Sequence, residues 1–216
     1  MKLLFINPNS SAGMTEAIVA TARAAVPHAE VIGWTNADGP PAIQGAADGE
    51  AAVPGLLAMV PAAKEAGVDV LIIGCFDDTG LDAVRDSADF PVIGLGQASF
   101  HAAALWGGRF AVLTTLPISI PVIEENLIGT GFGAESLGVF ASDLPVLAVD
   151  EGGAHVIDRL TQRIGLIDNQ GASSVILGCA GMTRHATRLQ RDAGIRLIDP
   201  VRAAACFAEA LIKSAA

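Results

Sequence analysis

The sequence predicts an α/β protein made of two pseudo-symmetric lobes, each built on a parallel sheet. Short apolar runs alternate with helical stretches along all 216 residues, which is typical of parallel strands covered by helices. The second half of the chain also repeats the order of elements of the first half. Hydrophobic residues make up 51% of the chain and aromatic residues only 5%, a composition that suits helices packed closely on a sheet.

The first half is expected to open with a strand over Lys2–Asn7, whose unbroken apolar run indicates burial on both faces. The turn Asn7-Pro8-Asn9-Ser10-Ser11 follows and carries helix-capping residues. Gly, Pro and Asp residues indicate a long loop over Thr35–Gly49. The remaining expected elements are a helix over Met14–Val26, a strand over Glu30–Thr35, a helix over Val53–Ala66, a strand over Asp69–Gly74, a helix over Asp78–Ser87 and a strand over Pro91–Leu95.

The second half restarts with a strand over Phe110–Thr115, so that its opening mirrors that of the first half. The further expected elements are a turn over Pro117–Pro121, a helix over Val122–Gly129, a strand over Ser136–Phe140, helical structure over Asp150–Gln170, a strand over Ser174–Gly178, a helix over Thr183–Ala193, a strand over Ile195–Ile198 and a closing helix over Pro200–Ser214.

Charge and composition exclude several classes of protein. With 13 Lys and Arg against 23 Asp and Glu, the net charge is −10, which argues against nucleic-acid binding. The N-terminus lacks the pattern of a signal peptide, and no apolar run reaches the roughly 18 residues of a membrane span. Three cysteines cannot all pair and lack metal-ligand spacing. We therefore expect a cytoplasmic protein with free thiols, no metal and no membrane contact.

Two of the three cysteines occupy equivalent places in the repeat. Cys75 ends the apolar run that starts at Val70, and Cys179 ends the run that starts at Val175. Ligands of open α/β sheets bind at the carboxyl ends of the strands, so two facing lobes would bring both thiols to one cleft. Cys206 has apolar neighbours in the closing helix, and we expect it to be a core residue.

A pair of thiols on opposite faces of a carbon acid can invert it, because one removes the proton and the other returns a proton to the other face. One thiol must then be ionised near neutral pH, against an ordinary pKa of roughly 8.5. Both cysteines precede expected helices, whose N-termini lower a thiol pKa. Asp77 and Asp78 would raise the pKa of Cys75 if they faced it; we expect them instead to cap the helix and point away.

The motifs around these positions resemble the hydantoin and allantoin racemases of the aspartate/glutamate racemase superfamily. The matching segments are Ile6-Asn7-Pro8-Asn9-Ser10, Cys75-Phe76-Asp77-Asp78-Thr79-Gly80-Leu81, Pro91-Val92-Ile93-Gly94, Thr114-Thr115-Leu116-Pro117, Val122-Ile123-Glu124 and Leu177-Gly178-Cys179-Ala180-Gly181-Met182. The resemblance implies that Cys75 and Cys179 are the catalytic acid and base. It also implies two flavodoxin-like lobes, residues 1–95 plus 200–216 and residues 96–199, with the active site between them.

The same resemblance implies a small-molecule substrate, no cofactor and a homo-oligomer. The expected substrate-binding residues lie in the turns after the strands and are Asn9, Ser10, Phe76, Asp77, Thr79, Thr114, Thr115, Ala180 and Gly181. The loop Gln44–Gly49 departs from the aromatic loops of relatives. A bulky residue at Ala46 or Ala47 is therefore expected to narrow the range of substrates.

Other functions stay open. An amino-acid racemase of the superfamily would need a site for a carboxylate, and Arg184 is the one arginine in the turns around either cysteine. An arylmalonate-type decarboxylase needs a single cysteine, so the pair argues against it. A non-catalytic binding module would not need reactive thiols. The glycines of Gly94–Ser99 do not complete a dinucleotide-binding fingerprint.

Overall fold

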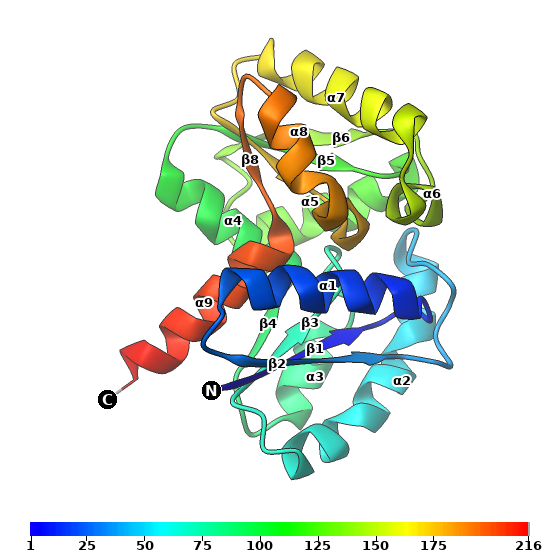
Figure 1. Ribbon diagram of the computed structural model, residues 1–216, viewed down its shortest axis with the longest axis vertical. Helices are drawn as coiled ribbons and strands as arrows, with labels where there is room; N and C mark the ends of the chain where they lie inside the picture. The colour runs from blue at the N-terminus through cyan, green and yellow to red at the C-terminus, as the bar shows by residue number, and fades with distance from the viewer. Residues whose placement is uncertain (216) are drawn as a thin grey trace.

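The computed structural model describes residues 1–215 and contains two four-stranded parallel sheets, one in each lobe (Figure 1). The first sheet has the strand order β2-β1-β3-β4, and the second has the equivalent order β6-β5-β7-β8. The strands are β1 (Lys2–Asn7), β2 (Glu30–Thr35), β3 (Val70–Ile73), β4 (Val92–Gly94), β5 (Phe110–Thr114), β6 (Ser136–Ala141), β7 (Ser174–Leu177) and β8 (Arg196–Ile198). The predicted fold class is thereby confirmed.

Helices cover both faces of each sheet. They are α1 (Ala12–Ala25), α2 (Ala46–Glu65), α3 (Leu81–Ser87), α4 (Leu95–Trp106), α5 (Ile120–Gly129), α6 (Val146–Glu151), α7 (Ala154–Asp168), α8 (Ala186–Asp192) and α9 (Pro200–Ser214), with 3-10 helices η1 (Pro117–Ser119) and η2 (Ala180–His185). None of the helices within residues 1–215 is both long and apolar enough to cross a membrane.

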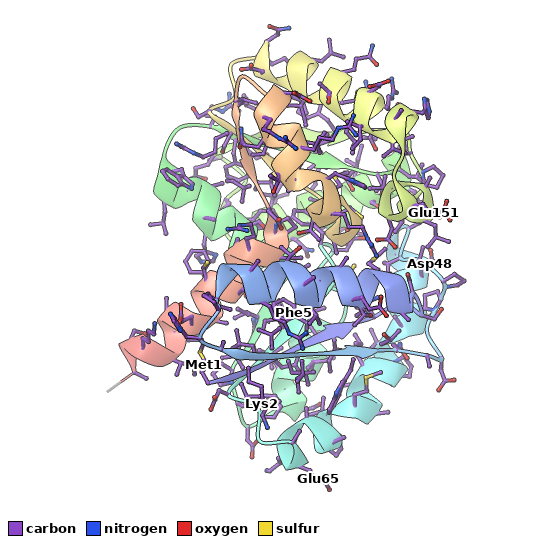
Figure 2. The ribbon with its side chains drawn as sticks, viewed as in Figure 1. Met1, Lys2, Phe5, Asp48, Glu65 and Glu151 are labelled. Atoms are coloured by element: carbon purple, nitrogen blue, oxygen red, sulfur yellow. The ribbon has the colours of Figure 1, made fainter. Side chains whose placement is uncertain are left out.

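The central strands β1 and β3, and likewise β5 and β7, are the parts of the sequence with unbroken apolar runs. Every residue of β3, β5 and β7 is buried. Figure 2 shows side chains filling both sides of each sheet. These adjacent strands lie where the strand order reverses, which is where open α/β sheets bind ligands.

Two of the expected helices differ from the observed ones. α2 begins at Ala46, seven residues before the expected start at Val53, within the predicted loop. The helical stretch expected over Asp150–Gln170 is broken into α6 and α7 at Gly152 and Gly153, both of which have positive φ angles. Only glycine adopts such angles at little cost, so the pair ends one helix and allows the next to start in a new direction.

Helix α4 was not expected at all. Its first turn is capped by a residue from a distant turn: the carboxylate of Asp78 accepts hydrogen bonds from the backbone N–H groups of Gly96 (2.8 Å) and Gln97 (2.7 Å). A Cβ atom at Gly94 or Gly96 would overlap this carboxylate. The absence of a side chain at these two glycines therefore allows Asp78 to reach the start of the helix.

The closing helix α9 contacts α1 and α4 and lies where the two lobes meet (Figure 1). Its buried face comprises Val201, Ala204, Ala205 and Ala208. Cys206 falls on the opposite face and is exposed, so the expectation that it is a core residue was wrong. The division into residues 1–95 plus 200–216 and 96–199 stays a prediction.

Candidate active site

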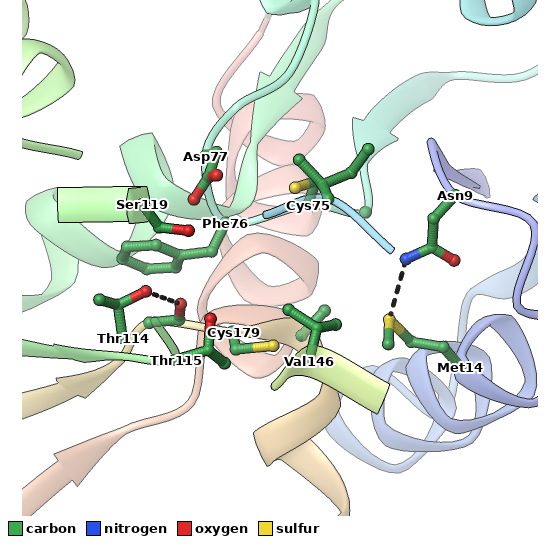
Figure 3. Close-up of a pocket in the computed structure, with 14 residues that line it drawn as sticks. Asn9, Met14, Cys75, Phe76, Asp77, Thr114, Thr115, Ser119, Val146 and Cys179 are labelled. Carbon is green, nitrogen blue, oxygen red and sulfur yellow. Dashed lines mark hydrogen bonds between the residues drawn. The ribbon is translucent and has the colours of Figure 1, made fainter. Parts of the chain in front are cut away.

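Cys75 and Cys179 line one cavity between the two lobes (Figure 3). Each cysteine follows a central strand, Cys75 after β3 and Cys179 after β7, with one glycine between strand and cysteine. The cavity holds about 340 Å³, its open mouth included. The repeat thus brings the two thiols, more than 100 positions apart in the sequence, to a single site.

The turn after β1 forms one wall of the cavity. The side-chain oxygen of Asn9 accepts hydrogen bonds from Asn7 Nδ2 (2.8 Å) and from the backbone N–H of Ser11 (2.9 Å). Its amide nitrogen contacts the sulfur of Met14 at 3.4 Å. Because its oxygen is occupied, Asn9 presents its N–H₂ group to the cavity (Figure 3).

The equivalent turn after β5 forms the opposite wall. Thr114 and Thr115 are buried and line the cavity, together with Ser119 at the end of η1. Thr114 donates a hydrogen bond to the carbonyl of Gly178 at 3.3 Å, which ties this wall to the strand that carries Cys179. The wall offers neutral hydroxyl groups only.

The two neighbouring aspartates in the turn after Cys75 point in different directions. Asp77 lines the cavity, whereas Asp78 points to the first turn of α4. We expected both side chains to cap the following helix and to point away from the thiol. This was wrong for Asp77, which faces the cavity. It was also wrong for Asp78, which caps α4 instead of the helix that directly follows it. Asp78 has a φ angle of 51°, a conformation that Asp tolerates better than most residues and that turns the two side chains apart.

Burial dominates the acid–base properties of both thiols. It raises the pKa of Cys75 far above its usual range, with a further upward contribution from Asp77 and a downward one from the Thr79 hydroxyl. Burial also raises the pKa of Cys179 to about 12, although hydrogen bonds from the backbone N–H groups of Gly181 and Met182 lower it. The predicted lowering of the thiol pKa by helix N-termini is thus outweighed by desolvation.

Burial likewise raises the pKa of the Asp77 carboxyl to about 7. Within residues 1–215 no hydrogen bond or opposite charge offsets this desolvation. Burial raises the pKa of Asp78 to about 7 as well, although the N–H groups of Gln97 and Gly96 lower it.

Six of the nine expected substrate-binding residues line the cavity, namely Asn9, Phe76, Asp77, Thr114, Thr115 and Ala180. Three do not. Ser10 donates to the carbonyl of Pro40, Thr79 donates to the sulfur of Cys75 at 3.5 Å, and Gly181 supplies a backbone N–H to Cys179. Phe76 also packs edge-on against Phe100, at 5.8 Å between ring centroids, so it serves the core as well.

Sequence reasoning missed four lining residues with notable side chains: Met14, Ile43, Ser119 and Val146. Ile43 lies in the loop before α2 and is buried. Ala46 and Ala47 in the first turn of α2 are exposed and do not line the cavity. The expectation that these two alanines shape the pocket was therefore wrong, and Ile43 holds that place. The loop is tied across the cleft by Gln44, whose side-chain oxygen accepts the N–H of Val146 at 3.0 Å.

Arg184 does not reach the cavity. Its guanidinium pairs with Asp150 at 2.9 Å and donates to the carbonyl of Gly13, which links the second lobe to α1. His101 and His185 also lie outside the lining residues; His185 contacts the carbonyl of Val149 at 2.8 Å. Among the described residues no group of three or more His, Cys, Asp or Glu side chains is arranged to hold a metal ion.

Comparison with known proteins gives one consistent result. Residues 3–208 match the family model described as Asp/Glu/Hydantoin racemase. A hydantoin racemase of Rhizobium meliloti is 41% identical over 98% of this chain and 89% of its own length. The structure of an allantoin racemase from Klebsiella pneumoniae superposes with a TM-score of 0.93 at 36% identity, covering 99% of this chain and 88% of the other. A glutamate racemase from Campylobacter jejuni shares the fold, with a TM-score of 0.72 at 21% identity over 98% and 86% of the two chains.

Proposed function

The chain belongs to the Asp/Glu/Hydantoin racemase family, and from this premise we propose that it racemises 5-substituted hydantoins by a two-thiol mechanism without a cofactor. Allantoin, which is itself a hydantoin with a ureido group at carbon 5, is included in this class. The observation that carries the proposal is the presence of Cys75 and Cys179 in one cavity, at equivalent positions of the two lobes.

In the proposed reaction the thiolate of one cysteine removes the proton from carbon 5 of the ring. The electron pair of the broken C–H bond moves into the adjacent carbonyl and forms an enolate. The thiol of the other cysteine then donates its proton to the opposite face of carbon 5, and the carbonyl reforms. Each turnover leaves the two cysteines with exchanged protonation states, so the reverse reaction starts from the other thiol.

Such a mechanism needs one ionised and one protonated thiol, and the electrostatics of the cavity disfavour the ionisation of both thiols together. Burial raises both thiol pKa values, and a charge on Cys179 raises that of Cys75 further. Two thiolates together are therefore disfavoured. The N–H₂ group of Asn9 and the hydroxyl groups of Thr115 and Ser119 are available to stabilise the enolate oxygen.

The resemblance to the hydantoin racemase of Rhizobium meliloti and the allantoin racemase of Klebsiella pneumoniae supports the choice of substrate. An amino-acid racemase is the alternative. It would need a cation or another firm site for the substrate carboxylate, and Arg184 is engaged with Asp150. We also propose that the enzyme assembles as a homo-oligomer in the cytoplasm.

The test is incubation of the enzyme with enantiopure 5-substituted hydantoins and allantoin in heavy water. We expect optical rotation to decay and deuterium to enter carbon 5 at linked rates, because inversion and exchange share the same proton transfers. A protein that binds these compounds but leaves both signals at the uncatalysed rate would contradict the proposal.

A further inference from the structure

We propose that Asp77 selects the class of substrate, because its carboxyl group accepts a ring N–H of a neutral cyclic amide and repels compounds that carry a free carboxylate. This inference rests on the proposed function and goes further, since it assigns the discrimination between cyclic amides and amino acids to one side chain.

The position of Asp77 is the first observation. Its carboxyl group faces the cavity that holds both thiols, two positions after Cys75 in the same turn (Figure 3). The turn is held in place because Asn126 Nδ2, on α5 of the second lobe, donates to the backbone carbonyl of Asp77 at 2.9 Å. The side chain is thus presented by a fixed backbone.

The carboxyl group lacks a partner within the described part of the protein. Asp78, its neighbour, accepts two backbone hydrogen bonds, but within residues 1–215 the carboxyl of Asp77 has neither a hydrogen-bond donor nor a cation. The side chain of Asp77 is half-buried, and a carboxylate that loses part of its hydration without gaining a donor is destabilised. A ligand that brings an N–H group into the cavity removes this cost, and a charge-assisted hydrogen bond forms.

The charges around Asp77 favour the same ligand. Cys75, Cys179 and Asp78 are the titratable groups that interact with it, and all three become negative when they ionise. Among the described residues that line the cavity there is neither a lysine nor an arginine. The α-carboxylate of an amino acid would therefore meet only negative or neutral groups.

The remaining polar groups complement a cyclic amide. Asn9 offers its N–H₂ group, and Thr115 and Ser119 offer hydroxyl groups. These neutral donors suit the ring carbonyl oxygens, whereas the carboxyl of Asp77 suits a ring N–H. The N–C=O units of a hydantoin contain both kinds of group, while a free amino acid near neutral pH pairs a carboxylate with an ammonium group.

The experiment compares two ligands of nearly equal size: a 5-substituted hydantoin and the N-carbamoyl amino acid that results from opening its ring. The second carries a carboxylate where the first has a ring amide. Dissociation constants are measured by calorimetry at about pH 8, where Asp77, with a pKa raised to about 7, is ionised. The proteins compared are the wild type, Asp77→Asn, which keeps the size of the side chain, and the control Asp86→Asn. Asp86 is exposed on α3, so the control makes the same change of net charge outside the cavity.

We expect Asp77→Asn to weaken binding of the hydantoin by roughly 10- to 100-fold, because a charge-assisted hydrogen bond is lost. The same change should strengthen binding of the N-carbamoyl amino acid by at least about 10-fold, because a repulsive charge is removed. Asp86→Asn should change the dissociation constant of neither ligand by more than about twofold. Damage to the fold would weaken both ligands, so opposite changes identify discrimination by the carboxylate.

Equal changes for the two ligands in Asp77→Asn, or no change for either, would overturn the role of Asp77. This outcome is separable from failure of the proposed function. The proposed function fails if the wild-type enzyme does not exchange the hydrogen at carbon 5, whereas the binding comparison does not depend on turnover.

Discussion

The hydroxyl group of Thr79 donates a hydrogen bond to the sulfur of Cys75 across 3.5 Å, within the turn that follows β3. It lowers the pKa of Cys75, whereas burial and the charge of Asp77 raise it. Thr79 is itself buried and does not line the cavity. It therefore acts on the reaction through the thiol and is a positioning residue.

Replacement of Thr79 by valine keeps the shape of the side chain and removes this donor. The thiolate of Cys75 loses a stabilising hydrogen bond, so its pKa rises further and the acid limb of the profile of kcat/KM against pH moves to higher pH. We expect kcat/KM near pH 7 to fall by roughly 10-fold. Thr79→Ser restores the hydroxyl and should restore the profile. An unchanged profile in Thr79→Val would show that the hydrogen bond does not tune the thiol.

Ile43 should control which 5-substituents fit. Ile43→Ala enlarges the cavity, and the ratio of kcat/KM for a large to that for a small substituent should rise by about 10-fold. A ratio is measured because it does not depend on the fraction of folded enzyme. Ala46→Phe is the control, since Ala46 is exposed outside the cavity. A change of the ratio in Ala46→Phe but not in Ile43→Ala would refute this assignment.

Asp78 should matter for stability rather than for chemistry. Asp78→Ala removes the acceptor of two backbone N–H groups at the start of α4. We expect the free energy of unfolding in urea to drop by about 1–2 kcal/mol. Asp82→Ala, at an exposed position of α3, provides the comparison, because the ion pair of Asp82 with Arg85 lies at the surface and contributes little. Equal losses in the two variants would argue against the cap.

Removal of metal ions should leave the reaction unchanged. The proposed proton transfers use only thiols and neutral donors, and the described residues contain no metal-binding cluster. We expect full activity after dialysis against a strong chelator, without added pyridoxal phosphate or nucleotide. Activity that disappears on dialysis and returns with a metal would overturn the two-thiol scheme.

The strand pattern could be read from the sequence because the central strands are buried on both faces and have apolar residues throughout. The internal repeat of these strands also predicted that Cys75 and Cys179 lie in one cavity. Helix α4 could not be predicted, since its cap comes from Asp78, which is distant in the sequence, and since Gly94 and Gly96 at its start obscure the helical pattern. Cys206 was misplaced because its neighbours Ala205 and Phe207 are apolar, although helical geometry turns it away from the buried face.

The lining residues of the pocket could be predicted only where they lie at the ends of the repeated strands. Thr114 ends β5 and Thr115 follows it directly, much as Asn9 lies just after β1. Ile43 reaches the cavity from the loop before α2, and Val146 reaches it from the start of α6. The paths of both segments depend on tertiary contacts, such as that between Gln44 and Val146. The direction of Asp77 likewise depends on the local backbone at Asp78, which the residue types do not reveal.

The central claim is that Cys75 and Cys179 act on opposite faces of the substrate, and single replacements by serine test it in heavy water. Serine has nearly the shape of cysteine but is a much weaker acid. Racemisation should fall by at least roughly 10²-fold in each variant, because inversion needs both groups. Cys206→Ser, at an exposed position outside the cavity, should racemise at close to the wild-type rate.

The decisive measurement is the exchange of the hydrogen at carbon 5 for deuterium, followed separately for each enantiomer in Cys75→Ser and Cys179→Ser. The remaining cysteine can still remove a proton from its own face and return a deuteron there. We predict exchange without inversion for one enantiomer in Cys75→Ser and for the opposite enantiomer in Cys179→Ser. Exchange of the same enantiomer in both variants, or racemisation near the wild-type rate in either, would contradict the account.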